Sequence, residues 1–183
     1  MTDLADAVAR ARSSYADRRP HSAALAASAA EVMPGGNTRT VLQFDPFPFR
    51  VESTEGSVLI DVDGHRAVDL LGNFTAGLFG HDVPAVREAV IAQLERGWAI
   101  GAPGPLEVEL AALICARFES IDQVRFTNSG TEANLMAVGT ATHLTGRRTV
   151  VVFEDGYHGG VLTFSHGVGL LNVPHEFVVL PFR

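Results

Sequence analysis

The chain has 183 residues, of which 46% are apolar and 19% are charged, a balance typical of a globular domain rather than a disordered segment. Its formal net charge is −7 and no cluster of basic residues occurs, which argues against nucleic acid or an acidic membrane surface as a partner. The single cysteine, Cys115, excludes an intrachain disulfide, and no signal-peptide pattern or membrane-length apolar run is found, so we expect a cytoplasmic protein.

The first part of the chain predicts helices followed by a β-hairpin. The alanine-rich residues 1–32 predict two helical segments separated near Pro20. Residues 41–52 are expected to be extended, because each of their two prolines disfavours the helical region for the residue before it. The stretch "SVLIDVDGHRAVDLL" (57–71) predicts a hairpin in which Asp63–Gly64 forms a two-residue turn.

The second part alternates helices with apolar strands. Three helices are predicted: one capped by Asp82 and ended by Gly97, one from Pro105 to about Phe118, and one over 130–145 closed by Gly146. Strands are predicted over 123–127, over 148–154 and within 175–183. This alternation predicts an α/β fold, a mainly parallel sheet with helices on its faces. Cys115 is predicted to lie on a buried helix face as a small apolar side chain.

Small hydrogen-bonding residues gather at the strand-to-helix junction "RFTNSGTEANLMAVG" (125–139). Ser129 and Glu132 form an S-x-x-E capping box, Gly130 allows close approach of the backbone, and Thr131 adds a hydroxyl. Free N–H groups and the positive end of a helix suit a phosphate, so the junction is either a phosphate site or a cap without a ligand. The chain has no G-x-x-x-x-G-K-[ST] motif, which excludes a nucleotide P-loop.

A second loop, "FEDGYHGG" (153–160), follows the next predicted strand. Loops at the carboxyl ends of neighbouring parallel strands face one crevice. Tyr157 is suited to cover a flat ring and His158 to form a hydrogen bond or transfer a proton; the alternative is a glycine-rich surface turn. Together the two loops favour a phosphorylated, planar cofactor. The seven histidines show no metal-ligand spacing, and "DVDG" (61–64) lacks the later ligands of a calcium loop.

Four segments resemble the class III aminotransferases, pyridoxal-phosphate enzymes of fold type I: "MPGGNTRTV", "DVDGHRAVDLLGNFTAGLFGH", "RFTNSGTEANLMAV" and "VVFEDGYHGG". The combination of "PGGNTRTVLQFDPFP", "TNSGTEANLMA" and "GYHGGVL" is similar to β-amino-acid aminotransferases of the β-phenylalanine kind. Glutamate-1-semialdehyde aminomutases share much of the pattern. The resemblance implies that Ser129, Gly130 and Thr131 hold the phosphate of pyridoxal 5'-phosphate. It also implies that Tyr157 stacks on the pyridine ring, with His158 beside it.

The resemblance further implies that Arg39, in "GGNTRTV", pairs with the substrate carboxylate, because a planar guanidinium binds a carboxylate through two hydrogen bonds. Without the resemblance, Arg39 would be interpreted as a solvated loop arginine. The implied partners are an amino acid and a 2-oxo acid, and the implied assembly is a homodimer. Residues 1–72 are expected to form part of the small domain, and residues 73–183 the first part of the cofactor-binding domain.

The chain contains 14 arginines and no lysine. The family pattern requires a lysine that bonds covalently to the cofactor, and arginine cannot replace it because its guanidinium stays protonated. The family's carboxylate for the pyridine nitrogen is expected on a later strand, and Asp155 does not match that position. We therefore expect the N-terminal portion of an aminotransferase, inactive alone. The alternatives are a fragment of an aminomutase-like enzyme and a short, non-catalytic phosphate-binding or dimerisation module.

Overall fold

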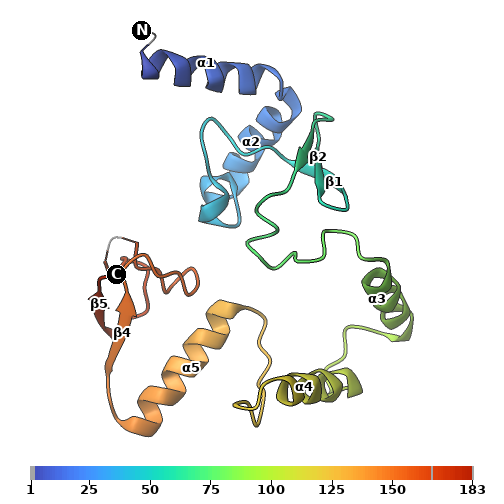
Figure 1. Cartoon of the computed structure of the whole chain (residues 1–183). Coiled ribbons are helices and arrows are strands. Elements are labelled where there is room, and N and C mark those ends of the chain that lie inside the picture. Colours follow the sequence, from blue (N-terminus) through green and yellow to red (C-terminus); the bar gives the residue numbers. More distant parts are fainter. Residues whose placement is uncertain (1–2, 166, 183) are drawn as a thin grey trace. The chain divides into compact units, whose positions relative to one another are not determined.

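The computed structural model describes residues 3–165 and 167–182. The chain forms two compact units, with the boundary after Ile100 (Figure 1). The first unit contains helices, short turns and an antiparallel sheet, and the second contains helices and a parallel pair of strands. The predicted domain division after residue 72 remains a prediction.

Two helices open the first unit, α1 (Leu4–Asp17) and α2 (Pro20–Val32), and confirm the predicted break near Pro20. Pro20 occupies the first turn of α2, where its missing N–H would have no partner in the helix. Two 3₁₀ turns follow, η1 (Pro34–Gly36) and η2 (Thr40–Leu42). The prediction that residues 41–52 are extended is therefore wrong at its start. The prolines of this stretch restrict only the residues directly before them, which leaves η2 free to form.

The sheet of the first unit consists of β1 (Val51–Glu55), β2 (Val58–Asp61) and β3 (Arg66–Val68), paired antiparallel in that order. The predicted hairpin is confirmed, but its two-residue turn is wrong, because residues 61–65 separate the paired residues Ile60 and Arg66. The wider turn is held by the Asp61 carboxylate, which accepts hydrogen bonds from the N–H groups of Asp63 (3.0 Å) and His65 (2.7 Å).

Helix α3 (Pro84–Arg96) completes the regular elements of the first unit. Gly97 ends it with φ +104, as predicted, but the N-cap residue is Val83 and not Asp82. Pro84 fixes the first helical position and holds the preceding residue in an extended conformation, so the cap falls one residue later than predicted. The Asp82 carboxylate instead pairs with Arg87 at 3.4 Å.

The second unit contains α4 (Pro105–Arg117), α5 (Gly130–Thr145), β4 (Thr149–Phe153) and β5 (Glu176–Leu180). β4 and β5 pair in parallel, from Thr149 opposite Glu176 to Phe153 opposite Leu180. The predicted helix over 130–145 is confirmed, including Gly146 at its end with φ +67.

Two predictions for the second unit are wrong. Residues 123–127 form no strand, since none of the described residues pairs with them, and β propensity alone does not supply a partner. Cys115 is partly exposed rather than buried, and its thiol lies 3.5 Å from the carbonyl oxygen of Asp122.

A small core joins α5, the strand pair and the loop after β4. Val152 of β4 packs with Leu162 and Phe164, and the Phe164 ring meets the Phe177 ring edge-on at 5.0 Å. Leu135 of α5 packs against the same cluster. The loop after β4 is thus fixed to both the strand pair and α5. No helix in the described part of the chain is long and apolar enough to cross a membrane.

Candidate functional site

The first turn of α5 presents free hydrogen-bond donors. Ser129 is the N-cap residue, and its Oγ accepts a hydrogen bond from the Glu132 N–H at 3.2 Å. The Glu132 carboxylate turns back to accept from the Asn128 N–H at 2.9 Å, one residue earlier than in the usual capping box. Within the described residues, the N–H groups of Gly130 and Thr131 form no hydrogen bond. These two donors remain available to an anion.

The loop after β4 lies directly on this helix terminus. Gly159 is buried with φ +124, and a Cβ atom there would overlap the Thr131 hydroxyl and come within 2.8 Å of the Thr131 Cα. The Asn134 side-chain amide donates to the carbonyl oxygen of His158 at 2.9 Å. The structure therefore brings the two predicted loops together. Asn134 was not predicted as a residue that contacts this loop. The pattern that could have indicated it is its spacing of three residues from Thr131, which places both side chains on one face of the helix.

The loop after β4 folds back on itself. The His158 N–H donates to the Leu162 carbonyl at 2.8 Å, and the Phe164 N–H donates to the Gly156 carbonyl at 3.0 Å. Tyr157 pairs with Thr163 through an isolated antiparallel bridge, and its side chain is 63% exposed. The Tyr157 ring is therefore accessible to a planar ligand.

This arrangement fits a phosphate group. The Ser129 hydroxyl accepts one hydrogen bond in the cap and keeps its own proton to donate, and the Thr131 hydroxyl lies one helical position beyond Gly130. The positive end of the helix dipole adds to these donors. Among the described residues, no group of three or more His, Cys, Asp or Glu side chains is arranged to hold a metal ion.

Arg39 belongs to the first compact unit, whereas Ser129, Thr131 and Tyr157 belong to the second. Arg39 is exposed, and its guanidinium forms no hydrogen bond or ion pair with any described residue. Its carbonyl oxygen accepts from the Leu42 N–H at 3.0 Å, which places it at the start of η2.

Sequence reasoning also missed a carboxylate at the N-terminus of α2. The N-cap residue of α2 is Arg19, whose side chain forms no capping hydrogen bond. Asp63 of the hairpin turn takes this role, and its carboxylate accepts from the N–H groups of His21 (2.8 Å) and Ser22 (2.9 Å). Burial favours protonation of Asp63, but the hydrogen bonds from Ser22 and His21 outweigh it and lower the pKa to about 2.

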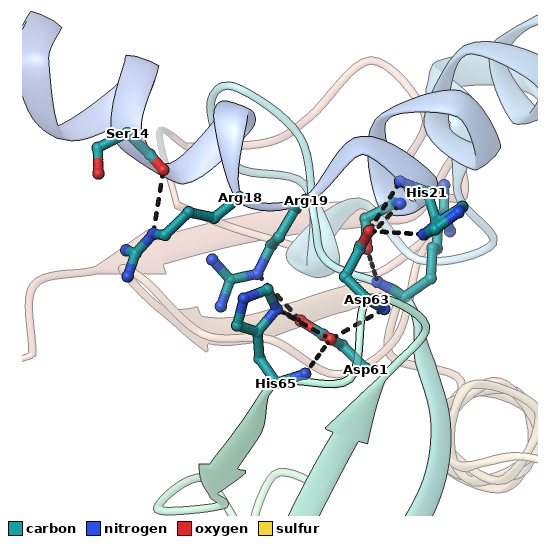
Figure 2. Close-up of polar contacts among 9 residues, drawn as sticks. Ser14, Arg18, Arg19, His21, Asp61, Asp63 and His65 are labelled. Atoms are coloured by element: carbon teal, nitrogen blue, oxygen red, sulfur yellow. Dashed lines mark hydrogen bonds and ion pairs between the residues drawn. The ribbon is translucent and has the colours of Figure 1, made fainter.

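A second carboxylate extends this contact. Figure 2 shows the Arg19 and His65 side chains both directed at the Asp61 carboxylate, with Asp63 beside His21. The Arg19 Nε atom donates to Asp61 at 3.0 Å, and the Asp61 side chain is 3% exposed. Burial opposes ionisation of Asp61, but its hydrogen bonds with His65 and Arg19 lower its pKa. The sequence feature that indicated this contact was the absence of a capping residue before Pro20, which leaves the first N–H groups of α2 in need of another acceptor.

Comparison with known proteins identifies the family. A model of aminotransferase class-III matches residues 42–166. The chain is 48% identical over 180 residues to the β-phenylalanine transaminase of Variovorax paradoxus, covering 98% of this chain and 41% of that protein. It is 38% identical over 153 residues to the glutamate-1-semialdehyde 2,1-aminomutase of Methanoculleus marisnigri, covering 81% of this chain and 37% of that protein.

A crystal structure of a β-phenylalanine aminotransferase from Variovorax paradoxus superposes with a TM-score of 0.94 at 47% identity, over 98% of this chain and 42% of that one. The chain thus spans about 41% of the length of that relative's sequence. The superposition confirms the predicted fold, part of an α/β fold type I transferase. On this evidence, the chain belongs to the class III aminotransferase family.

Proposed function

We propose that this chain supplies the phosphate-binding residues and a substrate-binding arginine of a pyridoxal-phosphate-dependent aminotransferase. The reaction is transfer of an amino group from a β-amino acid to a 2-oxo acid. The observation that supports the proposal is the packing of Gly159 on Thr131, which joins the loop carrying Tyr157 to the helix terminus that has two free N–H groups and two hydroxyls. The 48% identity to a β-phenylalanine transaminase supports the choice of substrate class.

Each residue has a defined task in this proposal. Ser129, Gly130 and Thr131 bind the phosphate, Tyr157 covers one face of the ring, and His158 forms a hydrogen bond beside it. When bound, the cofactor supplies an electron sink for the amine substrate.

Arg39 binds the substrate carboxylate through two parallel hydrogen bonds. Its exposed guanidinium has no partner among the described residues, so the binding of a carboxylate breaks no existing ion pair.

The proposal includes a partner segment. No lysine occurs among the 183 residues, so the lysine that bonds to the cofactor comes from polypeptide outside this sequence. We expect the chain by itself to bind pyridoxal phosphate without transaminating. We also expect the complete enzyme to be a homodimer.

Equilibrium dialysis of the purified chain against pyridoxal phosphate tests the phosphate site. Inorganic phosphate should compete with the cofactor. Ser129→Ala should weaken binding about tenfold or more, because a hydrogen bond to a charged group contributes ~1.5–3 kcal/mol. Thr142→Ala is the matched control, since it removes a hydroxyl of the same helix that donates to the Gly139 carbonyl. Equal affinity of the two variants, or no competition by phosphate, would contradict the proposal.

An aminomutase-like activity is the alternative, supported by the 38% identity to a glutamate-1-semialdehyde aminomutase. In enzyme reconstituted with a lysine-containing partner segment, amino transfer from a β-amino acid to a 2-oxo acid supports the aminotransferase, whereas isomerisation of glutamate 1-semialdehyde without such transfer supports the aminomutase. The same reconstituted enzyme tests the role of Arg39. Arg39→Ala should abolish use of β-amino acids, whereas Arg66→Ala, which removes an exposed arginine paired with Glu55, should not. Unchanged activity of Arg39→Ala would remove the carboxylate role. A chain that binds the cofactor but gains no activity with any partner segment would support the non-catalytic module.

A further inference from the structure

The geometry points to Arg50 as the residue that positions the loop carrying Arg39. This inference rests on the proposed role of Arg39 in binding the substrate carboxylate. Arg50 lies directly before β1, and the loop is the segment 33–39 between α2 and η2. Arg50 is a positioning residue in this inference and does not itself contact the substrate.

The Arg50 guanidinium forms hydrogen bonds with two consecutive residues of the loop. Its Nη2 atom donates to the carbonyl oxygen of Gly36 at 2.9 Å, and its Nη1 atom donates to the Asn37 side-chain oxygen at 3.3 Å. The Asn37 amide in turn donates to the Gln43 side chain at 2.6 Å, which closes the loop across η2. The anchored residues lie two and three positions before Arg39, so their placement fixes where the backbone of Arg39 begins.

Arg50 is itself held by α2. Its backbone N–H donates to the hydroxyl of Ser22 at 3.2 Å, and the Ser22 side chain is fully buried. On the other side of the loop, Gly36 adopts φ +66 and sits against α2, where an added Cβ would lie 3.5 Å from the Ala30 nitrogen. The loop is thus fixed between the backbone of α2 and the guanidinium of Arg50.

The charge of Arg50 is not neutralised within the part of the chain that the structure describes. Its acceptors are the neutral oxygens of Gly36 and Asn37, and no carboxylate there forms an ion pair with it. Its Nε atom is buried without a hydrogen-bond partner.

A pocket of about 310 Å³ lies beside the loop, lined among others by Gly35, Gly36, Phe47 and Arg50. Without the guanidinium, the loop has room to move into this space. Lysine at this position keeps the charge but lacks the planar fork that reaches two acceptors at once. We therefore expect Arg50→Gln to free the loop most and Arg50→Lys to free it less.

Limited proteolysis with trypsin measures the order of the loop without any cofactor. Cleavage of the peptide bond after Arg39, followed by mass spectrometry, should accelerate about tenfold in Arg50→Gln, because the variant loses the charged hydrogen bonds that hold the loop. Arg66→Gln is the matched control, since it removes an exposed arginine of the same unit that pairs with Glu55 at 2.7 Å. Its cleavage rate after Arg39 should not change.

The cleavage pattern decides the inference. A rise confined to the bond after Arg39, with cleavage after Arg87 unchanged, supports a positioning role. An unchanged rate after Arg39 would overturn the inference. An equal rise at every arginine of the first unit would also overturn it, because Arg50 would then stabilise the unit in general.

Kinetics of the reconstituted enzyme separate this inference from the proposed function. Arg50→Gln should raise KM for a β-amino acid about tenfold with a smaller change in kcat, while KM for an amine without a carboxylate stays constant. Arg50→Lys should recover part of the loss. If Arg39→Ala leaves KM unchanged, the carboxylate role of Arg39 fails, and the trypsin result still decides whether Arg50 positions the loop. Equal KM changes for both amines would contradict a role through Arg39.

Discussion

Gly159 controls how closely the loop after β4 approaches α5. Its φ of +124 is accessible to glycine and costly for other residues, and an added Cβ would overlap Thr131. We expect Gly159→Ala to move the loop off the helix terminus and to weaken pyridoxal-phosphate binding about tenfold or more, since such strain costs ~1–3 kcal/mol. Equilibrium dialysis gives the dissociation constant.

The neighbouring glycine provides the control for this prediction. Gly160 is exposed, and a Cβ added there would meet no atom within 4 Å. Gly160→Ala should therefore leave the affinity within about twofold, because surface changes of this kind cost less than ~0.5 kcal/mol. If both variants bind equally well, the close contact with Thr131 does not shape the site.

At the level of helices and strands, the contact between the hairpin turn and α2 has a predictable pH dependence. The pKa of Asp63 is about 2, below the ordinary value of 3.8. The ionised carboxylate therefore stabilises the folded unit above pH 3.8, and this contribution is lost as the pH falls toward 2. NMR should show the amide protons of His21 and Ser22 titrating with a midpoint near 2.

Two variants test the source of this titration. Asp63→Asn should abolish it at both amides, because the amide side chain has no charge to lose. Asp45→Asn should leave it intact, since Asp45 is an exposed carboxylate that pairs with Arg12 elsewhere in the same unit. A midpoint at 3.8 in the unmodified chain would show that Asp63 does not cap α2.

Local sequence signals predicted the elements that local interactions determine. Gly97 and Gly146 end helices where expected, and Ser129 begins α5, because each signal acts within one helical turn. The sequence could not reveal the capping of α2 by Asp63, since Asp63 lies 41 positions after Ser22. The strand predicted over 123–127 failed for the same reason, because a strand requires a partner that its own residues cannot specify.

The candidate site was predictable to a similar degree. The capping motif indicated Ser129 and the loop motif indicated Tyr157 and His158, and their roles in binding stay predictions. The direct packing of Gly159 on Thr131 and the bond from Asn134 to His158 depend on tertiary contacts and were not predicted. The role of Arg50 in the loop of Arg39 was not predicted either, since it links residues 13 and 14 positions apart through side-chain geometry.

The chain as a whole exposes apolar side chains that lie at helical spacing on α3 and α4. Val86, Val90 and Leu94 of α3 are at least half exposed. On α4, Leu106 and Leu113 are 55% and 68% exposed. Both helices thus carry an apolar face that the described structure leaves largely open to solvent. Contiguous apolar surface of this kind promotes association.

We therefore expect the purified chain to bind the dye ANS and to self-associate as its concentration rises, measured by fluorescence and analytical ultracentrifugation. The double variant Leu106→Gln/Leu113→Gln should reduce both signals while changing the free energy of unfolding by less than ~1 kcal/mol, because exposed positions contribute little to folding. Leu162→Gln places the same substitution at a residue that is 3% exposed, and it should unfold the second unit and increase dye binding. A double variant that binds as much dye as the unmodified chain would show that α4 is not the exposed apolar surface.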